Sequence, residues 1–173
     1  MRVLTDPRKG HKQAVVYGLL RLLDKRHIER EPFTDAVIAF FENLYFNQAY
    51  PIEPITVIID LRGWSVRRHT PYRVVKDGLE VLQSYYPDRL GRVFLVNYSS
   101  TLRAAYAVIS PIIDPGARDK VLWVSDNPQE FLAKYLPAKS IPIFLGGQLD
   151  VSFPGVDLAA EWKDPSLVET GYF

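Results

Sequence analysis

Four short runs of apolar residues recur along the chain. They span residues 13–20, 55–61, 93–96 and 121–124 and contain few polar positions. Runs of this length that are apolar on both faces predict strands in a sheet that is covered on both sides. Because the segments between them carry helical patterns, the chain predicts an α/β fold.

The segments between these runs show helical periodicity. Residues 35–47 place apolar side chains at helical spacing, with Thr34 as the predicted N-cap. Thr70 and Pro71 form an N-cap and first-turn pair ahead of a second helix. The apolar stripe of that helix consists of Val75, Leu79, Leu82 and Tyr86. A further helix is predicted at residues 128–136.

The segment at residues 101–113 differs from the other predicted helices because its apolar side chains point in all directions around the axis. These side chains are Leu102, Ala104, Ala105, Tyr106, Ala107, Val108, Ile109, Ile112 and Ile113. A helix that is apolar on every face is buried or meets lipid. Since this helix, capped by Ser99 or Ser100, lies between two predicted strands, we predict a lid over an apolar cavity.

Composition narrows the classes of protein to consider. A length of 173 residues favours one domain, and the net charge of +1 argues against a strongly basic nucleic-acid binder. The chain contains no cysteine, which excludes disulfides and thiolate metal sites. Its first residues do not form a signal peptide and no apolar run is long enough to span a bilayer, so any membrane contact is expected to be peripheral.

Enzymatic sites are poorly supported by the motifs. Residues 63–67 offer half of a nucleophile elbow around Ser65, but the fifth position is Arg and no acid separates Ser65 from the histidine that follows it. We interpret this segment as a tight strand exit in which Gly63 allows an unusual backbone angle. The three histidines are scattered and predict no metal site, and no phosphate-binding glycine motif is present. Gly146 and Gly147 are interpreted as a chain reversal.

Three acidic or basic positions border the apolar runs. Asp60 ends a predicted strand beside Arg62, and the favoured interpretation is structural, with the carboxylate holding loop amides or the arginine. Asp88 and Lys120 lie in polar segments on either side of the apolar helix. If that helix is a lid, both could meet a polar head group at the cavity wall, whereas spacing alone favours a surface salt bridge.

Five pieces of the sequence occur in a characteristic order. They are DLRGW at 60–64, YYPDRLGRVFLVN at 85–97, the apolar helix ending in SPIIDP, a lysine before a strand, and LPAKSIPIFLGG at 136–147. From about residue 10 to about residue 150, this order resembles the CRAL-TRIO lipid-binding domain family. That family includes phosphatidylinositol transfer proteins and the tocopherol- and retinal-binding proteins.

The resemblance implies a mixed β-sheet floor with helices behind it and an apolar gate helix over a lipid cavity. We expect one domain over residues 1–173, with a core at about 10–150 and an irregular tail at 151–173. Most family members also have a helical lobe before the first strand, and we expect this chain to lack that lobe. The gate would present Leu102, Ala105, Tyr106, Ile109 and Ile113. The floor would present Ile55, Val57, Ile59, Phe94 and Val96. Tyr106 and Ile109, close to one turn apart, are expected to share a face that touches the bilayer.

Phosphatidylinositol-binding members hold the inositol phosphate region with an acidic residue of a YYPE-like motif and a lysine after the gate. The matching residues are Asp88, one methylene shorter than Glu, and Lys120. Ala117 stands where such members often carry a hydroxyl. Ile55 and Val57 replace the hydroxyl residues of members that also hold phosphatidylcholine, so choline-lipid exchange is not expected.

The resemblance therefore predicts a non-enzymatic protein that binds, and transfers between membranes, a single lipid of the phosphoinositide type. The alternatives are a carrier of a neutral lipid such as a tocopherol or isoprenoid, and a protein-interaction or regulatory module with a vestigial pocket. We expect a cytoplasmic protein that contacts membranes transiently. No cofactor, metal or nucleic acid is expected, and a protein partner or a parent multidomain protein is compatible with the module.

Overall fold

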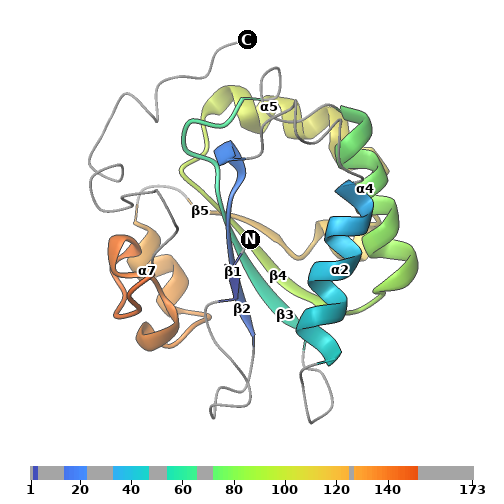
Figure 1. Ribbon diagram of the computed structural model, residues 1–173. Coiled ribbons are helices and arrows are strands. Elements are labelled where there is room, and N and C mark those ends of the chain that lie inside the picture. Colours follow the sequence, from blue (N-terminus) through green and yellow to red (C-terminus); the bar gives the residue numbers. More distant parts are fainter. Residues whose placement is uncertain are drawn as a thin grey trace.

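A five-stranded sheet organises the molecule (Figure 1). The computed structural model describes residues 2–3, 14–22, 33–46, 54–65, 72–124 and 127–151. The strands are β1 (Arg2–Val3), β2 (Val15–Leu19), β3 (Ile55–Asp60), β4 (Leu90–Val96) and β5 (Val121–Val124), and their spatial order follows the sequence. β1 pairs antiparallel with β2, while β2 to β5 are parallel. The described sheet is therefore mixed, and the α/β prediction is confirmed.

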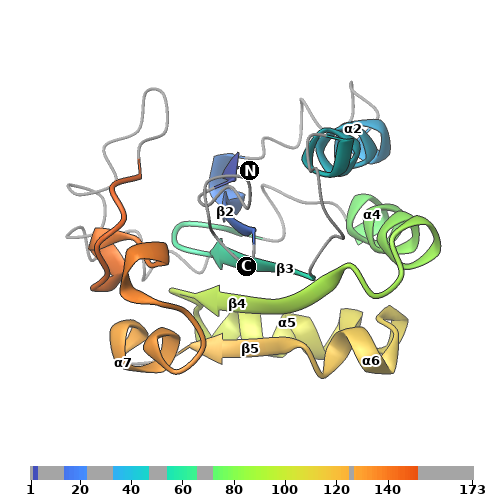
Figure 2. The ribbon, with the colours of Figure 1, turned by 90° about the horizontal axis from the view of Figure 1, so that it is seen from below.

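Helices cover both faces of this sheet. The α-helices are α2 (Phe33–Phe46), α4 (Tyr72–Tyr85), α5 (Ser100–Ile109), α6 (Pro115–Arg118) and α7 (Pro128–Ala133). Short 3-10 turns follow at η2 (Leu20–Leu22), η3 (Ser110–Ile112), η4 (Ala138–Ser140) and η5 (Ile143–Leu145). α2 and α4 lie side by side on one side of the sheet, and α7 lies on the other (Figures 1 and 2).

The alternation of side chains along the strands divides the core into two clusters. The cluster under α7 and the last two 3-10 turns contains Val15, Tyr17, Leu19, Ile58, Phe94, Val96, Val124, Leu132, Leu136, Ile141 and Leu145. The cluster under α2, α4 and α5 contains Ala14, Val16, Phe41, Ile55, Val57, Leu61, Val93, Leu95 and Leu102. The predicted gate helix α5 thus shares its face of the sheet with α2 and α4. Burial on both faces explains why β3 and β4 are nearly all apolar.

The limits of the helices follow from local chemistry. Ser99 is the N-cap of α5, as predicted, because its side-chain oxygen accepts a hydrogen bond from the Leu102 N–H at 3.2 Å. The helix ends early because Pro111 has no N–H for the Ala107 carbonyl, which instead accepts from the Ser110 hydroxyl at 3.3 Å. The N-cap prediction for Thr34 is wrong, because α2 already begins at Phe33.

Several predictions fall outside the described residues. They concern Thr70, Pro71, the three histidines and the tail from residue 152 onward. The chain reversal at the glycine pair is confirmed. Gly146 has a φ of 84°, and a Cβ on Gly147 would lie 2.0 Å from the Ile141 carbonyl oxygen.

Aromatic packing joins α2 to the end of α4. The rings of Phe41 and Tyr86 stack with centroids 5.0 Å apart, and the Tyr86 hydroxyl donates to Glu42 Oε1 at 2.8 Å. Burial, followed by this hydrogen bond and the Glu42 charge, raises the pKa of Tyr86 to about 12. The hydroxyl is therefore a protonated donor at neutral pH, and the two helices form one packed layer.

Candidate functional site

Two groups of polar residues lie at opposite ends of the parallel strands. One surrounds Asp60 at the carboxyl end of β3, and the other pairs Asp88 with Lys120 near the amino ends of β4 and β5. The carboxyl ends of parallel strands are the usual ligand site in open α/β sheets. The two ends differ in their exposure, because Asp60 is fully buried and Asp88 is almost fully exposed.

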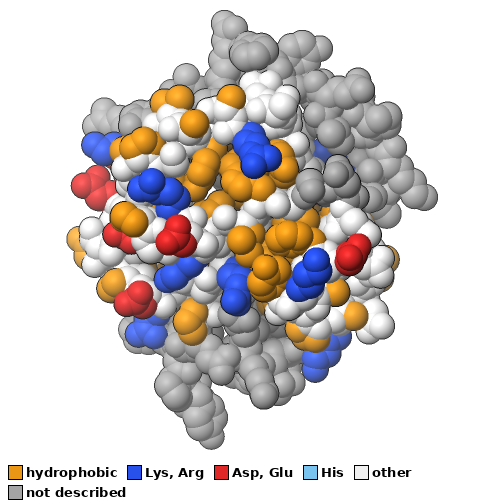
Figure 3. Space-filling view, turned by 180° about the vertical axis from the view of Figure 1, so that it is seen from behind, with side chains coloured by type: hydrophobic (Ala, Val, Ile, Leu, Met, Phe, Trp, Pro, Cys, Tyr) orange, Lys and Arg blue, Asp and Glu red, His pale blue; other side chains and the backbone are white. Residues whose placement is uncertain are grey.

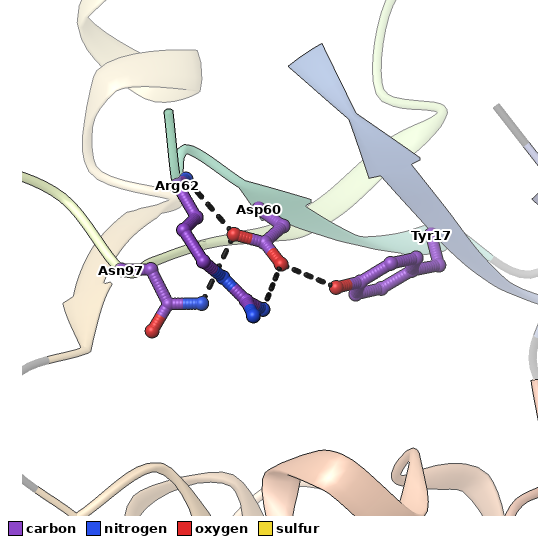
Figure 4. Close-up of polar contacts among 4 residues, drawn as sticks. All are labelled: Tyr17, Asp60, Arg62 and Asn97. Carbon is purple, nitrogen blue, oxygen red and sulfur yellow. Dashed lines mark hydrogen bonds and ion pairs between the residues drawn. The ribbon is translucent and has the colours of Figure 1, made fainter. Parts of the chain in front are cut away.

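The Asp60 carboxylate is fully enclosed by donors (Figure 4). It accepts hydrogen bonds from the Tyr17 hydroxyl at 2.8 Å, the Arg62 backbone N–H at 2.9 Å, Arg62 Nη2 at 2.8 Å and Asn97 Nδ2 at 3.0 Å. The side chains of Asp60 and Arg62 are 0% and 3% exposed. Asn97 reaches the carboxylate from a left-handed backbone conformation, with a φ of 56°. The network therefore ties β2, β3 and the exit of β4 together.

This arrangement confirms the structural interpretation of Asp60. A charge buried to this degree is tolerated only when it is paired and hydrogen-bonded. Burial, followed by the Asp60 charge and hydrogen bond, raises the pKa of Tyr17 well above its ordinary value, so its hydroxyl remains a donor. The carboxylate is enclosed within the fold and holds β2, β3 and the end of β4 together. This hydrogen-bond network is called the Asp60 lock below.

The half-elbow after β3 also has a structural role. Gly63 has a φ of 65°, which confirms the predicted tight strand exit, and Ser65 is buried. Within the described residues, no group of three or more His, Cys, Asp or Glu side chains could hold a metal ion. In the same part of the chain, no helix combines the length and the apolar character needed to cross a bilayer.

At the amino ends of the strands, the structure brings Asp88 and Lys120 together. Lys120 Nζ lies 3.9 Å from Asp88 Oδ1, across the neighbouring strands β4 and β5. Asp88 occupies the turn between α4 and β4 with a φ of 59°, and the Lys120 carbonyl accepts from the Val93 N–H at 2.9 Å. The Asp88 side chain is 99% exposed and that of Lys120 is 32% exposed. An exposed pair at this distance is weak, so both charges are accessible to an incoming ligand.

The predicted gate helix α5 has two distinct faces. Leu102 is buried at its start, and Ile113 is buried just beyond η3. Arg103, Ala104 and Ala107 are exposed, and Val108 is 70% exposed. In the observed packing an inner side of α5 meets the sheet and an outer side remains open, and the prediction that this helix forms a lid over an apolar cavity stays a prediction.

The inner side of α5 rests on an aromatic group that sequence reasoning missed. Trp123 of β5 receives the ring edges of Tyr98 at 4.8 Å and Tyr106 at 5.1 Å between centroids. The Arg103 guanidinium carbon lies 6.0 Å from a Trp123 ring centroid. Tyr106 therefore packs inward in this structure. The expectation that it shares a bilayer-facing side with Ile109, whose side chain lies outside the described ones, stays a prediction. The sequence feature that could have indicated this aromatic group is Trp123, because the other residues of β5 are aliphatic.

The five predicted floor residues do not share one surface. Ile55, Val57 and Ile59 face the cluster under α5, but Phe94 and Val96 belong to the cluster under α7. The register pairs Val57 with Val93, and Ile59 with Leu95, so these are the β4 residues on the α5 side. The β4 side chains on the α5 side are therefore Val93 and Leu95 and not the predicted Phe94 and Val96.

Comparison with known proteins identifies relatives over most of the chain. The family model described as the CRAL/TRIO domain matches residues 7–147. A SEC14 cytosolic factor from Yarrowia lipolytica is 33% identical over 120 residues, which cover 68% of this chain and 24% of that protein. A SEC14 cytosolic factor from Eremothecium gossypii is 30% identical over 122 residues, covering 68% of this chain and 40% of that protein.

More distant relatives include proteins named for lipid transfer. The phosphatidylinositol/phosphatidylcholine transfer protein SFH4 of Arabidopsis thaliana is 24% identical over 127 residues, covering 69% of this chain and 21% of that protein. Among solved structures, the crystal structure of Sfh5 matches with a TM-score of 0.57 and 23% identity, over 72% of this chain and 45% of that one. The Sfh5 likeness concerns the fold, and the chain spans less than half the length of each of these proteins.

The Asp60 network makes a specific prediction about stability. Asp60→Asn keeps the side-chain shape but removes the negative charge that lies 2.8 Å from the buried Arg62 guanidinium. We expect this change to lower the free energy of unfolding by about 3–5 kcal/mol. The matched control is Asp88→Asn, which makes the same chemical change in an exposed pair and should have little effect. Urea unfolding followed by circular dichroism measures both, and equal losses would contradict the structural role of Asp60.

Proposed function

The chain belongs to the CRAL/TRIO domain family, and we propose that it binds one lipid between α5 and the sheet and exchanges it with membranes without changing it chemically. The observation that carries this proposal is the construction of α5. Its inner side meets an apolar strand surface, and its outer side exposes Ala104, Ala107 and Val108 to solvent. A short helix whose outer side exposes apolar side chains beside the basic Arg103 suits an element that leaves the sheet and enters a membrane surface.

The proposed floor follows the observed side-chain alternation. Ile55, Val57 and Ile59 of β3 lie beside Val93 and Leu95 of β4 on the face that α5 covers. These aliphatic side chains offer no polar group to an acyl chain. In this function Phe94 and Val96 support the floor from behind, because they pack with the cluster under α7.

We infer that the ligand has a phosphoinositide-type head group. Lys120 and Asp88 supply an ammonium and a carboxylate close together near the ends of β4 and β5. An ammonium forms a charge-assisted hydrogen bond with a phosphodiester, and a carboxylate accepts from hydroxyl groups. The names of the Arabidopsis relatives agree with this class of lipid.

The outer surface near α5, β5 and α7 is suited to transient contact with an anionic membrane. Figure 3 shows hydrophobic side chains interleaved with Lys and Arg on this face. Arg92 lies over Tyr135 at 5.0 Å, Lys134 over Phe131 at 6.0 Å and Arg103 over Trp123 at 6.0 Å. Basic groups beside aromatic rings favour the membrane interface, where anionic head groups attract the cations.

A protein-interaction module is the second candidate function. It is favoured by Trp123, because Tyr98 and Tyr106 pack on its indole and occupy space beneath α5. In that case α5 would be a fixed part of the core, and its exposed side would bind a protein. A carrier of a neutral lipid would need the same apolar side chains of β3 and β4 but would not need the Asp88–Lys120 pair.

Occupancy distinguishes the carrier from the module. Burial of each acyl methylene contributes about 0.8 kcal/mol, so a bound acyl chain should survive purification. We expect native mass spectra to show a lipid adduct, or to show one after incubation with liposomes. Spectra that contain bare polypeptide under both conditions would favour the module.

Lys120→Ala tests the head-group assignment. Loss of the ammonium should weaken phosphatidylinositol binding about tenfold, or about 1.4 kcal/mol, with no change in binding of a tocopherol. Lys139→Ala is the matched control, because it removes the same charge from an exposed position in η4, on the opposite face of the sheet from α5. This change should leave the binding of both lipids unchanged. Equal weakening for both lipids would assign Lys120 a structural role instead.

Val108→Asp tests the gate. Val108 is exposed, so the change should leave the melting temperature nearly unaltered, but a carboxylate resists entry into the membrane. Lipid transfer between liposomes should slow about tenfold, which corresponds to about 1.4 kcal/mol. Ile143→Asp is the matched control, since Ile143 is 58% exposed and lies in η5. If both variants transfer lipid at the parent rate, α5 does not enter the membrane.

A further inference from the structure

The inner side of α5 contains one polar group that the described structure does not satisfy. The Tyr106 hydroxyl is buried and has no hydrogen-bond partner among the described residues. Buried hydroxyls without a partner are rare, because the lost bonds to water are not replaced. Such a group at the interface between a proposed gate and its floor indicates a missing acceptor or donor.

The position of the Tyr106 ring is determined by its neighbours. Its edge packs on Trp123 with centroids 5.1 Å apart and an interplanar angle of 83°, and Tyr98 packs on the same indole. The hydroxyl is buried although the Tyr106 residue as a whole is only partly buried. Arg118, whose charge acts on the hydroxyl, donates to the Ile113 carbonyl at 3.2 Å.

The surroundings also define what kind of partner the hydroxyl needs. Burial raises the pKa of Tyr106, and the Arg118 charge opposes this only in part, so the group stays protonated at neutral pH. A neutral phenol in an apolar site can donate one strong hydrogen bond. Leu102 and Ala105, which precede it on α5, carry no polar side-chain atom that could compete.

We propose that the Tyr106 hydroxyl donates a hydrogen bond to an ester carbonyl oxygen of the bound lipid, so that α5 selects ester-linked glycerolipids over ether-linked ones. This inference rests on the proposed lipid-binding function and assigns a specificity-determining residue within it. Ester carbonyls are the acceptors that a glycerophospholipid carries between its head group and its chains. Ether oxygens in the same place are poorer acceptors.

Tyr106→Phe should have opposite effects on stability and on binding. In the lipid-free protein, removal of an unsatisfied buried hydroxyl should raise the melting temperature by about 2–4 °C. Binding of diester phosphatidylinositol should weaken about fivefold. Binding of the diether form of phosphatidylinositol should be unchanged, since that lipid offers no carbonyl.

Tyr98→Phe is the matched control, because it removes the same atom from a ring that packs on the same Trp123. It should alter neither the melting temperature nor the preference between the two lipids. Delipidated protein is titrated with each lipid in vesicles, loading is measured by native mass spectrometry, and melting is measured before lipid is added.

The outcomes separate this inference from the proposed function. If the parent protein loads neither lipid, the carrier function fails and this inference fails with it. If the parent loads both lipids and Tyr106→Phe weakens both equally or neither, only the ester contact is overturned. A lower melting temperature for Tyr106→Phe would also overturn it, because the hydroxyl would then be satisfied without lipid, for example by a bound water.

Discussion

The rest of the structure depends on the buried Asp60 carboxylate. It accepts from Tyr17 of β2, from Arg62 after β3 and from Asn97 after β4, so a single side chain fixes the relative positions of three strands at their carboxyl ends. Asn97 lies two residues before Ser99, the N-cap of α5. The point at which α5 leaves the sheet is therefore determined by the same network.

The two faces of the sheet differ in how completely they are buried. The cluster under α7 is dominated by fully buried side chains, with few partly buried neighbours. The cluster under α2, α4 and α5 has many partly buried members, among them Trp64, Tyr98 and Trp123. Local opening requires least free energy where few apolar contacts are lost. The α5 face is thus the less completely buried side of the sheet, in agreement with the proposed gate, while the α7 face is the more completely buried side.

The strands could be predicted from the sequence because continuous apolar runs are typical of a sheet covered on both faces. The same property concealed the phase of β4: with apolar residues at every position, nothing indicated that Phe94 and Val96 face α7 while Val93 and Leu95 face α5. The sequence also did not indicate which side of α5 faces the sheet, because apolar residues occur all around that helix. The Asp60 lock, the Ser99 cap and the turn at Gly63 were predictable, because each depends on one local chemical preference. The Asp88–Lys120 ion pair joins residues far apart in the sequence, and it was favoured by the spacing of the polar segments, whereas the resemblance implied a role for both residues in head-group binding.

The aromatic group under α5 also gives the molecule an internal spectroscopic probe. The Trp123 indole is shielded by the edges of Tyr98 and Tyr106 and by the Arg103 guanidinium, and two of these three side chains belong to α5. Any displacement of that helix must change the polarity around the indole and with it the wavelength of its emission. The chain thus contains, without an added label, a chromophore whose environment is coupled to the position of its proposed gate.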